Sequence, residues 1–168
     1  MGYLKWKSLI IIGFLMSCTT LSENVINKDE SLLKIDSIIY EEVKYIDNNV
    51  LNIEKKILIN NILDTLSLKS AKGNEVLKIL LDIKYPKSYI KNKSKTGYKF
   101  VFKDKSKPLK SIIYNKGSDI KFSLEQSNLL YSTLKEYKLI INKGLYVKGW
   151  SKTFWGDRDN YDIQIDYK

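Results

Sequence analysis

The stretch YDIQIDYK, residues 161–168, alternates apolar and polar side chains from Tyr161 to Tyr167. Successive side chains of a β-strand point to opposite faces of its sheet, so this alternation predicts a strand that is buried on one face and exposed on the other. Two earlier stretches, residues 99–103 and 119–124, have the same period of two. We therefore expect the C-terminal half of the chain to form an antiparallel sheet.

The N-terminal half has a different period. Between residues 31 and 66, apolar side chains recur at steps of three and four, which predicts one amphipathic helix or two. The sequence DNN, residues 47–49, is the natural interruption, because Asn and Asp favour caps and turns over helix interiors. The sequence KGN, residues 72–74, closes this helical section. Residues 75–86 could form a short buried helix or a strand, since a short apolar run does not discriminate between them.

Two local signals add detail to the C-terminal half. The stretch INKGLY, residues 141–146, predicts a hairpin in which Gly144 supplies a positive φ angle. Ser123 and Gln126 match a capping box, which predicts a helix near residues 125–137. The expected fold class is α+β, with N-terminal amphipathic helices followed by an antiparallel β-sheet with one inserted helix.

Composition limits the chemistry that is open to the chain. It contains no histidine and one cysteine, so Ser-His-Asp catalysis, a Cys-His pair and His-ligated zinc cannot be assembled. No phosphate-binding glycine-rich motif and no nucleophile-elbow motif occurs. Asp157, Asp159 and Asp162 lack the glycine and the terminal glutamate of an EF-hand calcium loop. We expect no cofactor, no metal and no enzymatic activity, although paired carboxylates alone would suffice for a glycan hydrolase.

The N-terminus has the layout of a secretory signal. Two lysines precede an apolar run over residues 9–16, which is too short to span a membrane. The run ends with Leu15 and Met16, and Ser17 and Cys18 follow it directly. This tetrapeptide resembles the lipobox of bacterial lipoproteins, in which an aliphatic residue, a free position and a small residue precede the cysteine.

The resemblance implies that the thiol of Cys18 carries a diacylglyceryl group and that residues 1–17 are a signal peptide cut off just before it. The alternative is an ordinary cleaved signal or an uncleaved anchor. Residues 18–30 are polar and aperiodic, as a flexible tether should be, and residues 31–168 are expected to form a single α+β domain. The expected location is the cell envelope. In a cell with two membranes it is the outer membrane, because Thr19 is not the aspartate that retains lipoproteins of enteric-type bacteria at the inner one.

Positive charge is concentrated in one quarter of the chain. The formal net charge is +10 at pH 7, and residues 84–121 hold 12 lysines against two acidic residues. Lysines of this segment stand at odd-numbered positions, whereas Phe100 and Phe102 are even-numbered. If the two parts of the segment are extended, the lysines of each part would therefore point to one side and form a cationic strip. The candidate ligand-binding lysines are Lys99, Lys103, Lys105 and Lys107. Such a strip would meet anionic glycans or lipid headgroups; the alternative is a solvated sheet face.

An aromatic segment near the C-terminus is the second candidate surface. Residues 149–162 combine tryptophan and tyrosine with aspartate and arginine, a mixture typical of sugar- or peptide-binding loops and of interface hot spots. The candidate residues are Trp150, Trp155, Asp157, Arg158 and Tyr161. The alternative is a long hairpin connection whose tryptophans fill the core and whose arginine pairs with a neighbouring aspartate.

Together, these features predict a lipid-anchored cell-envelope lipoprotein that acts as a non-enzymatic binding module for anionic glycans or lipid headgroups. A structural or assembly accessory that docks on another envelope protein is the alternative, and a carboxylate-dependent glycan hydrolase is the third reading. The expected partners are the membrane, through the N-terminal lipid, an anionic ligand and an envelope protein. Nucleic acid is not expected, since the lysine-rich segment lacks the arginine forks and stacking aromatics of nucleic-acid modules.

Overall fold

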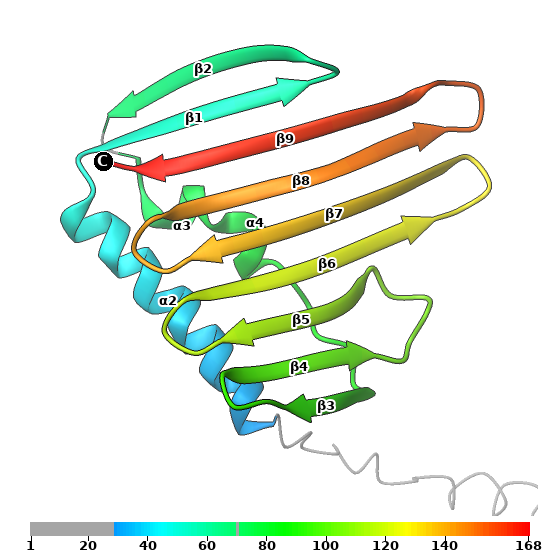
Figure 1. Cartoon of the computed structure of the whole chain (residues 1–168), viewed down its shortest axis with the longest axis horizontal. Helices are drawn as coiled ribbons and strands as arrows, with labels where there is room; N and C mark the ends of the chain where they lie inside the picture. The colour runs from blue at the N-terminus through cyan, green and yellow to red at the C-terminus, as the bar shows by residue number, and fades with distance from the viewer. Residues whose placement is uncertain (1–28, 70) are drawn as a thin grey trace, which may run out of the picture.

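The computed structural model describes residues 29–69 and 71–168. Figure 1 shows one long helix lying behind a single sheet of nine strands. Of the three helices in the described ranges, only the first is longer than four residues. The sheet therefore organises the fold.

The helices are α2 (Glu30–Asn49), α3 (Gly73–Val76) and α4 (Lys78–Leu81). The strands, in chain order, are β1 (Asn52–Ile59), β2 (Ile62–Lys69), β3 (Tyr89–Lys93), β4 (Gly97–Phe102), β5 (Leu109–Asn115), β6 (Asp119–Ser127), β7 (Tyr131–Ile140), β8 (Gly144–Thr153) and β9 (Arg158–Tyr167). Their spatial order is β2-β1-β9-β8-β7-β6-β5-β4-β3, and every neighbouring pair is antiparallel. Strands β3 to β9 thus form a meander, and the β1–β2 hairpin joins the outer side of β9.

Helix α2 follows the expected helical spacing. Asp29 accepts a hydrogen bond from the backbone N–H of Ser31 at 2.8 Å, which caps the first turn. The helix ends at Asn49, within the expected interruption, because the backbone of Val50 is already extended. Its apolar residues at steps of three and four share one core with the sheet: Leu32, Ile35, Ile39, Val43 and Ile46.

The prediction that helical structure extends to residue 66 is wrong. Residues 52–69 form the β1–β2 hairpin instead. Asn60 and Asn61 make its two-residue turn with φ angles of 48° and 72°, the positive values that a tight hairpin turn requires. Ile53 and Ile57 are four positions apart, a spacing that suggested a helix. In a strand, residues separated by an even number of positions also point to one face, so this spacing fits β1 equally well.

The prediction of an inserted helix near residues 125–137 is also wrong. These residues belong to β6, a turn and β7. Asn128 holds the turn, because its Oδ1 accepts hydrogen bonds from the backbone N–H groups of Leu130 at 2.8 Å and Tyr131 at 2.9 Å. The capping-box residue Gln126 is a strand residue opposite Thr133. For residues 29–69 and 71–168, the α+β class with an inserted helix is therefore corrected to one antiparallel sheet covered by a single long helix and two short ones.

The strands predicted from the period of two are confirmed, since β4, β6 and β9 contain nearly all of the three alternating stretches. Residues 75–86 hold the short helix α4 and the end of α3, which settles their ambiguity in favour of a helix. The β7–β8 hairpin forms, but its positive φ of 59° belongs to Asn142 and not to Gly144. Gly144 is needed for a different reason: a Cβ at this position would overlap the carbonyl oxygen of Ile165 on β9.

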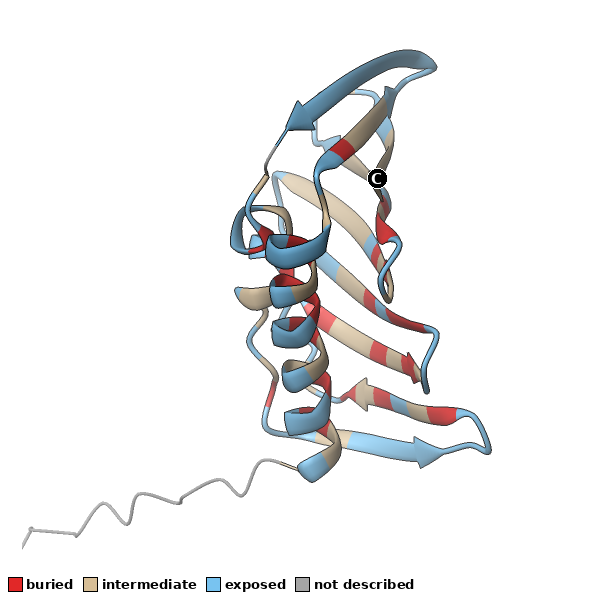
Figure 2. Ribbon diagram, turned by 90° about the vertical axis from the view of Figure 1, so that its left-hand side faces the viewer, coloured by how far each residue is buried: buried red, intermediate tan, exposed pale blue. Residues whose placement is uncertain are grey.

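The two faces of the sheet have different surroundings. Figure 2 shows the helices on one side of the sheet only. A row of apolar side chains crosses this side and packs with α2 and α4 in one hydrophobic core, each contributing roughly 1.5–3 kcal/mol when fully buried. The other side, formed by the residues that alternate with this core, is called the open face below. The core row consists of Phe100, Ile112, Phe122, Tyr137, Val147 and Ile163.

Candidate functional site

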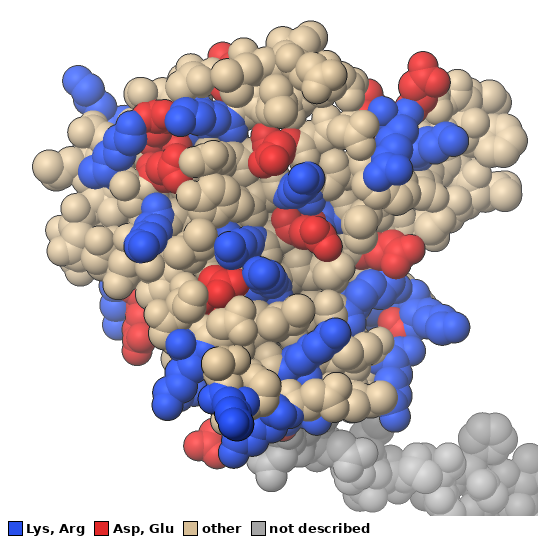
Figure 3. All heavy atoms as spheres, viewed as in Figure 1, with Lys and Arg blue, Asp and Glu red and all other residues tan. Residues whose placement is uncertain are grey.

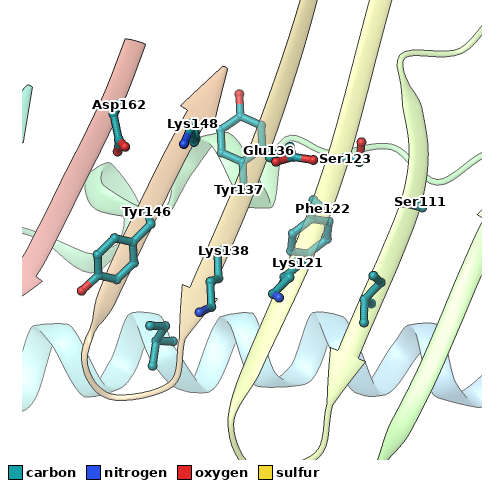
Figure 4. Close-up of a pocket in the computed structure, with 12 residues that line it drawn as sticks. Ser111, Lys121, Phe122, Ser123, Glu136, Tyr137, Lys138, Tyr146, Lys148 and Asp162 are labelled. Carbon is teal, nitrogen blue, oxygen red and sulfur yellow. The ribbon is translucent and has the colours of Figure 1, made fainter. Parts of the chain in front are cut away.

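The open face is hollowed where strands β5 to β9 cross its centre. The hollow has a volume of about 540 Å³, and the sheet forms its floor. Charged and hydroxyl side chains line it, whereas apolar atoms make up most of its accessible surface, the combination typical of a ligand site. Figure 4 shows this lining, whose open-face residues are Ser111, Ile113, Lys121, Ser123, Glu136, Lys138, Ile140, Tyr146, Lys148 and Asp162.

Two lysines face each other in the hollow. Lys121 on β6 is the direct cross-strand partner of Lys138 on β7, and Figure 4 shows their side chains next to each other. Like charges in this arrangement destabilise a sheet. Compensation is weak: Lys121 Nζ lies 3.9 Å from Asp119 Oδ2, and no carboxylate of the described residues lies within 4.0 Å of Lys138 Nζ. An anion held between the two ammonium groups would remove the repulsion.

A third lysine extends this row toward β3. Lys99 on β4 pairs with Ile113 on β5, and Ile113 in turn pairs with Lys121. Adjacent strands lie about 4.8 Å apart, so Lys99 stands roughly 10 Å from Lys121 on the same face. One of the predicted ligand-binding lysines is therefore in line with the facing pair.

The next row of the open face alternates in charge. Glu136, Lys148 and Asp162 are direct partners across β7, β8 and β9. Opposite charges in this arrangement contribute roughly 0.2–1 kcal/mol per pair to a sheet. This row has two carboxylates and one ammonium group, so together with Lys121 and Lys138 the charged side chains of the hollow leave a net charge of +1.

Hydroxyl groups complete the lining. Tyr146 donates a hydrogen bond to Asp166 Oδ1 at 2.9 Å, and Gln164 donates one to Asp166 Oδ2 at 2.6 Å. Burial and the hydrogen bond to Asp166 raise the pKa of Tyr146, so its phenol stays protonated at neutral pH. Ser111 and Ser123 are cross-strand partners on the floor of the hollow and offer two further hydroxyls to a ligand.

A second hollow, of about 480 Å³, adjoins the first and shares the row of alternating charge with it. It contains Trp150, over whose ring the guanidinium carbon of Arg158 lies 4.3 Å from the centroid. Asn60 fixes the rim, because its side chain donates to Asp159 Oδ1 at 2.8 Å and accepts from the backbone N–H of Asn160 at 3.0 Å. The two hollows together, called the trough below, could hold an extended ligand.

The predicted lysines are exposed, but they do not all lie on one face. Lys99 stands on the open face. Lys91, on the other arm of the β3–β4 hairpin, pairs with Phe100 and lies on the helix-covered side. The two arms therefore present lysines to opposite faces of the sheet. The remaining three predicted lysines lie in the β4–β5 connection, at one end of the strands: Lys103, Lys105 and Lys107.

The predicted aromatic segment is a long hairpin whose candidate residues are divided among three places. Trp150 and Arg158 belong to the trough. Tyr161 points to the helix-covered side, where it packs against the core. Trp155 and Asp157 lie in the β8–β9 turn, where Trp155 is 81% exposed.

Sequence reasoning misses the facing pair Lys121 and Lys138. The sequence predicts a helix near residues 125–137, so it does not predict β7, the strand on which Lys138 lies. The signal that could have found the pair is alternation, because Lys138 lies between the buried residues Tyr137 and Leu139. The cross-strand partner itself is set by the β6–β7 register, which no local pattern specifies.

The signal motif Leu15, Met16 and Ser17 and the predicted lipid-attachment residue Cys18 lie outside the described residues. Within residues 29–69 and 71–168, no helix is long and apolar enough to cross a membrane. The same ranges contain no group of three carboxylate or cysteine side chains placed to hold a metal ion.

No protein-family model matches the chain, and no match to it is found among curated proteins or solved structures. Its own geometry therefore supplies the basis for a function.

Proposed function

We propose that this protein is a lipid-anchored protein of the cell envelope that binds an acidic glycan in the trough of its open face without converting it chemically. The lipobox resemblance at Cys18 supports the anchor. For a protein in that location, polysaccharides carrying carboxylate or sulfate groups are accessible anionic ligands. The glycan is the ligand class that combines such charges with hydroxyl groups.

The facing pair Lys121 and Lys138 is the observation that supports this ligand class. A carboxylate or sulfate group between them would accept charge-assisted hydrogen bonds from both ammonium groups. Ser111 and Ser123 lie next to the pair and can exchange hydrogen bonds with sugar hydroxyls. The length of the trough, which crosses β5 to β9, fits an oligosaccharide better than a single sugar.

Calorimetric titration tests this binding with two oligosaccharides of equal length, one carrying uronate or sulfate groups and one neutral. We expect the acidic ligand to bind, with an affinity that falls as salt is added, and the neutral one not to bind. The double variant Lys121→Gln/Lys138→Gln should lose at least about tenfold in affinity, or about 1.4 kcal/mol.

The matched control is Lys34→Gln/Lys44→Gln, which removes two exposed lysines from α2 and changes the net charge equally. This control variant should bind the acidic oligosaccharide with the affinity of the wild-type protein. Equal losses in both double variants would reduce the effect to overall charge and would contradict the trough as the binding site.

The lipid anchor is tested independently by mass spectrometry of the N-terminal peptide from membrane-purified protein. We expect a peptide that begins at Cys18 and carries acyl chains, and we expect Cys18→Ser to lack this modification. An unmodified Cys18 would contradict the anchor and leave the glycan titration unaffected.

A second function, docking on another envelope protein as an assembly accessory, is favoured by the β2 edge of the sheet. All eight residues of β2 are exposed, and Ile62 and Leu63 keep 76% and 64% of their surface accessible. An apolar edge strand can pair with a strand of another chain. A membrane protein should then co-purify in stoichiometric amount, and Leu63→Lys/Leu66→Lys should release it. Purification without any stoichiometric partner would contradict docking.

A further inference from the structure

Exposed lysines gather at the end of the sheet formed by β3, β4 and β5. In Figure 3, the lower part of the molecule, where Figure 1 places these strands, is predominantly basic. The hairpin turn, the open face and the β4–β5 connection all contribute, so the charges surround this end. We call it the lysine-rich end and define it by the exposed residues Lys93, Lys95, Lys99, Lys103, Lys105 and Lys107.

Few carboxylates offset these charges. Residues 84–121 contain two acidic side chains, and both are engaged locally. Asp104 accepts hydrogen bonds from the hydroxyl of Ser106 at 2.6 Å and from its backbone N–H at 3.0 Å, which lowers the pKa of this carboxyl. Asp119 accepts one from the side chain of Asn115 at 3.0 Å. The exposed lysines therefore remain available to an external anion.

The connection between β4 and β5 has a defined conformation. Lys110 Nζ donates hydrogen bonds to the backbone carbonyl of Lys105 at 2.9 Å and to that of Lys107 at 3.0 Å. The backbone N–H of Lys107 also bonds to the carbonyl of Asp104 at 3.3 Å. The backbone of a connection held in this way loses little conformational entropy when its lysine side chains bind a ligand.

The chain enters the described fold at this same end. Asp29, the N-cap of α2, forms an ion pair with Lys91 of β3 at 2.9 Å. From there α2 runs toward the β1 side of the sheet, as Figure 1 shows, over about 30 Å for its 20 residues. The preceding segment from Cys18 to residue 28 has 11 residues, which reach at most about 40 Å. An anchor at Cys18 is thus tethered to the fold at the lysine-rich end, where residue 29 lies.

We propose that the lysine-rich end faces the membrane and binds the anionic phospholipid headgroups around the anchor. This role rests on the acylated Cys18 proposed above and is separate from glycan binding in the trough. A basic residue at an anionic membrane surface contributes about 1 kcal/mol, an attraction that falls off over about 8 Å at physiological salt. Several lysines at the anchored end therefore orient the sheet with β3 toward the membrane and β2 away from it.

The test uses the full-length protein purified from membranes and reconstituted into two kinds of vesicle, phosphatidylcholine alone and phosphatidylcholine with one-third phosphatidylglycerol. The rate of amine acetylation of each lysine is followed by mass spectrometry. We expect acetylation of Lys95, Lys105 and Lys107 to slow several-fold in the anionic vesicles and to recover in high salt. Lys44 on α2 and Lys69 on β2, both exposed and both remote from this end, should react equally in both vesicles.

A pair of triple variants sharpens this test. Lys95→Gln/Lys105→Gln/Lys107→Gln should lose the phosphatidylglycerol-dependent protection of β3 and β4 against hydrogen exchange. The control Lys44→Gln/Lys69→Gln/Lys72→Gln should keep it, because it removes the same charge from the C-terminal part of α2 and from the β2 side of the sheet.

Three results would overturn the membrane-facing role. Equal acetylation in both vesicles would do so while leaving the anchor intact, and so would slowing of Lys69 as strong as that of Lys95. A protein that fails to float even with neutral vesicles would lack the anchor, and the anchor and the membrane-facing role would then both fail, while glycan binding in the trough would not be affected.

Discussion

The carboxylate of Glu42, in the second half of α2, accepts a hydrogen bond from the backbone N–H of Asn142, which lies 2.9 Å from Oε1 and 3.1 Å from Oε2. Asn142 is the residue with positive φ in the β7–β8 turn, so this contact joins the long helix to the middle of the sheet. Glu42 is 2% exposed, and its burial raises its pKa to about 7 despite the hydrogen bond from Asn142.

Stability should therefore fall as pH rises from about 5 to about 8. The pKa of Glu42 is about 7 in the folded state against 4.5 for an unperturbed glutamate, so the folded state binds the proton more tightly. This contribution is fully present below pH 4.5 and is lost as pH rises through 7. Urea denaturation across this range measures the loss, on the order of 1.4 kcal/mol for each unit of pKa difference.

Glu42→Gln supplies the control for this pH dependence. Glutamine keeps an oxygen that can accept from Asn142 and carries no charge at any pH, so the slope should disappear. The chain has no histidine, the side chain that usually titrates in this range. A slope that survives the substitution would contradict the role of Glu42.

Phe122 and Lys121 are neighbours in β6 that face opposite ways. Phe122 is 1% exposed in the core, so Phe122→Ala should lower the free energy of unfolding by about 3–5 kcal/mol. Lys121→Gln, on the open face, should change it by less than about 1 kcal/mol. Equal effects in urea denaturation would contradict the assignment of the two faces.

The facing pair predicts opposite effects on stability and binding. Lys138→Gln removes the repulsion from Lys121 and should raise the free energy of unfolding by up to about 1 kcal/mol. The same variant should bind the acidic oligosaccharide more weakly. Lys44→Gln should alter neither quantity, since it lies on the exposed side of α2. A destabilised Lys138→Gln protein would show that the pair is not repulsive.

The two residues of the β1–β2 turn should respond differently to glycine. Asn61→Gly should leave stability unchanged or raise it, because glycine adopts the φ of 72° without strain. Asn60→Gly should lower stability by about 1 kcal/mol, because it removes two side-chain hydrogen bonds to β9. Thermal unfolding compares the two variants, and the reverse ranking would contradict the role assigned to the Asn60 side chain.

The sequence predicts those strands whose inward and outward residues differ sharply in polarity. Phe100 and Phe102 face the core while Lys99 faces solvent, so β4 can be read from its residues alone. The hairpin at residues 52–69 cannot be read in this way, because steps of four fit one face of a helix and one face of a strand equally well. Its local signal is the pair Asn60 and Asn61, which favours a two-residue turn.

The candidate site is less predictable than the fold because it depends on register. Lys99, Trp150 and Arg158 are found from composition, since each lies in a segment of unusual charge or aromatic content. The pairing of Lys121 with Lys138 is a property of two strands together, and a register shift of one residue would place them on opposite faces.

The position of β1 between β2 and β9 also sets the order in which the molecule can be completed. Asn52 and Lys168 exchange backbone hydrogen bonds at 3.0 and 2.9 Å, so β1, the first strand of the described residues, pairs with β9, the last one. The meander from β3 to β9 grows from contacts between successive strands, whereas joining β1 to β9 closes a loop that contains all of residues 60–157. Closure of such a loop is slow, because its entropy is lost before the new contacts form. An emerging chain therefore remains incompletely folded until β9 has been made.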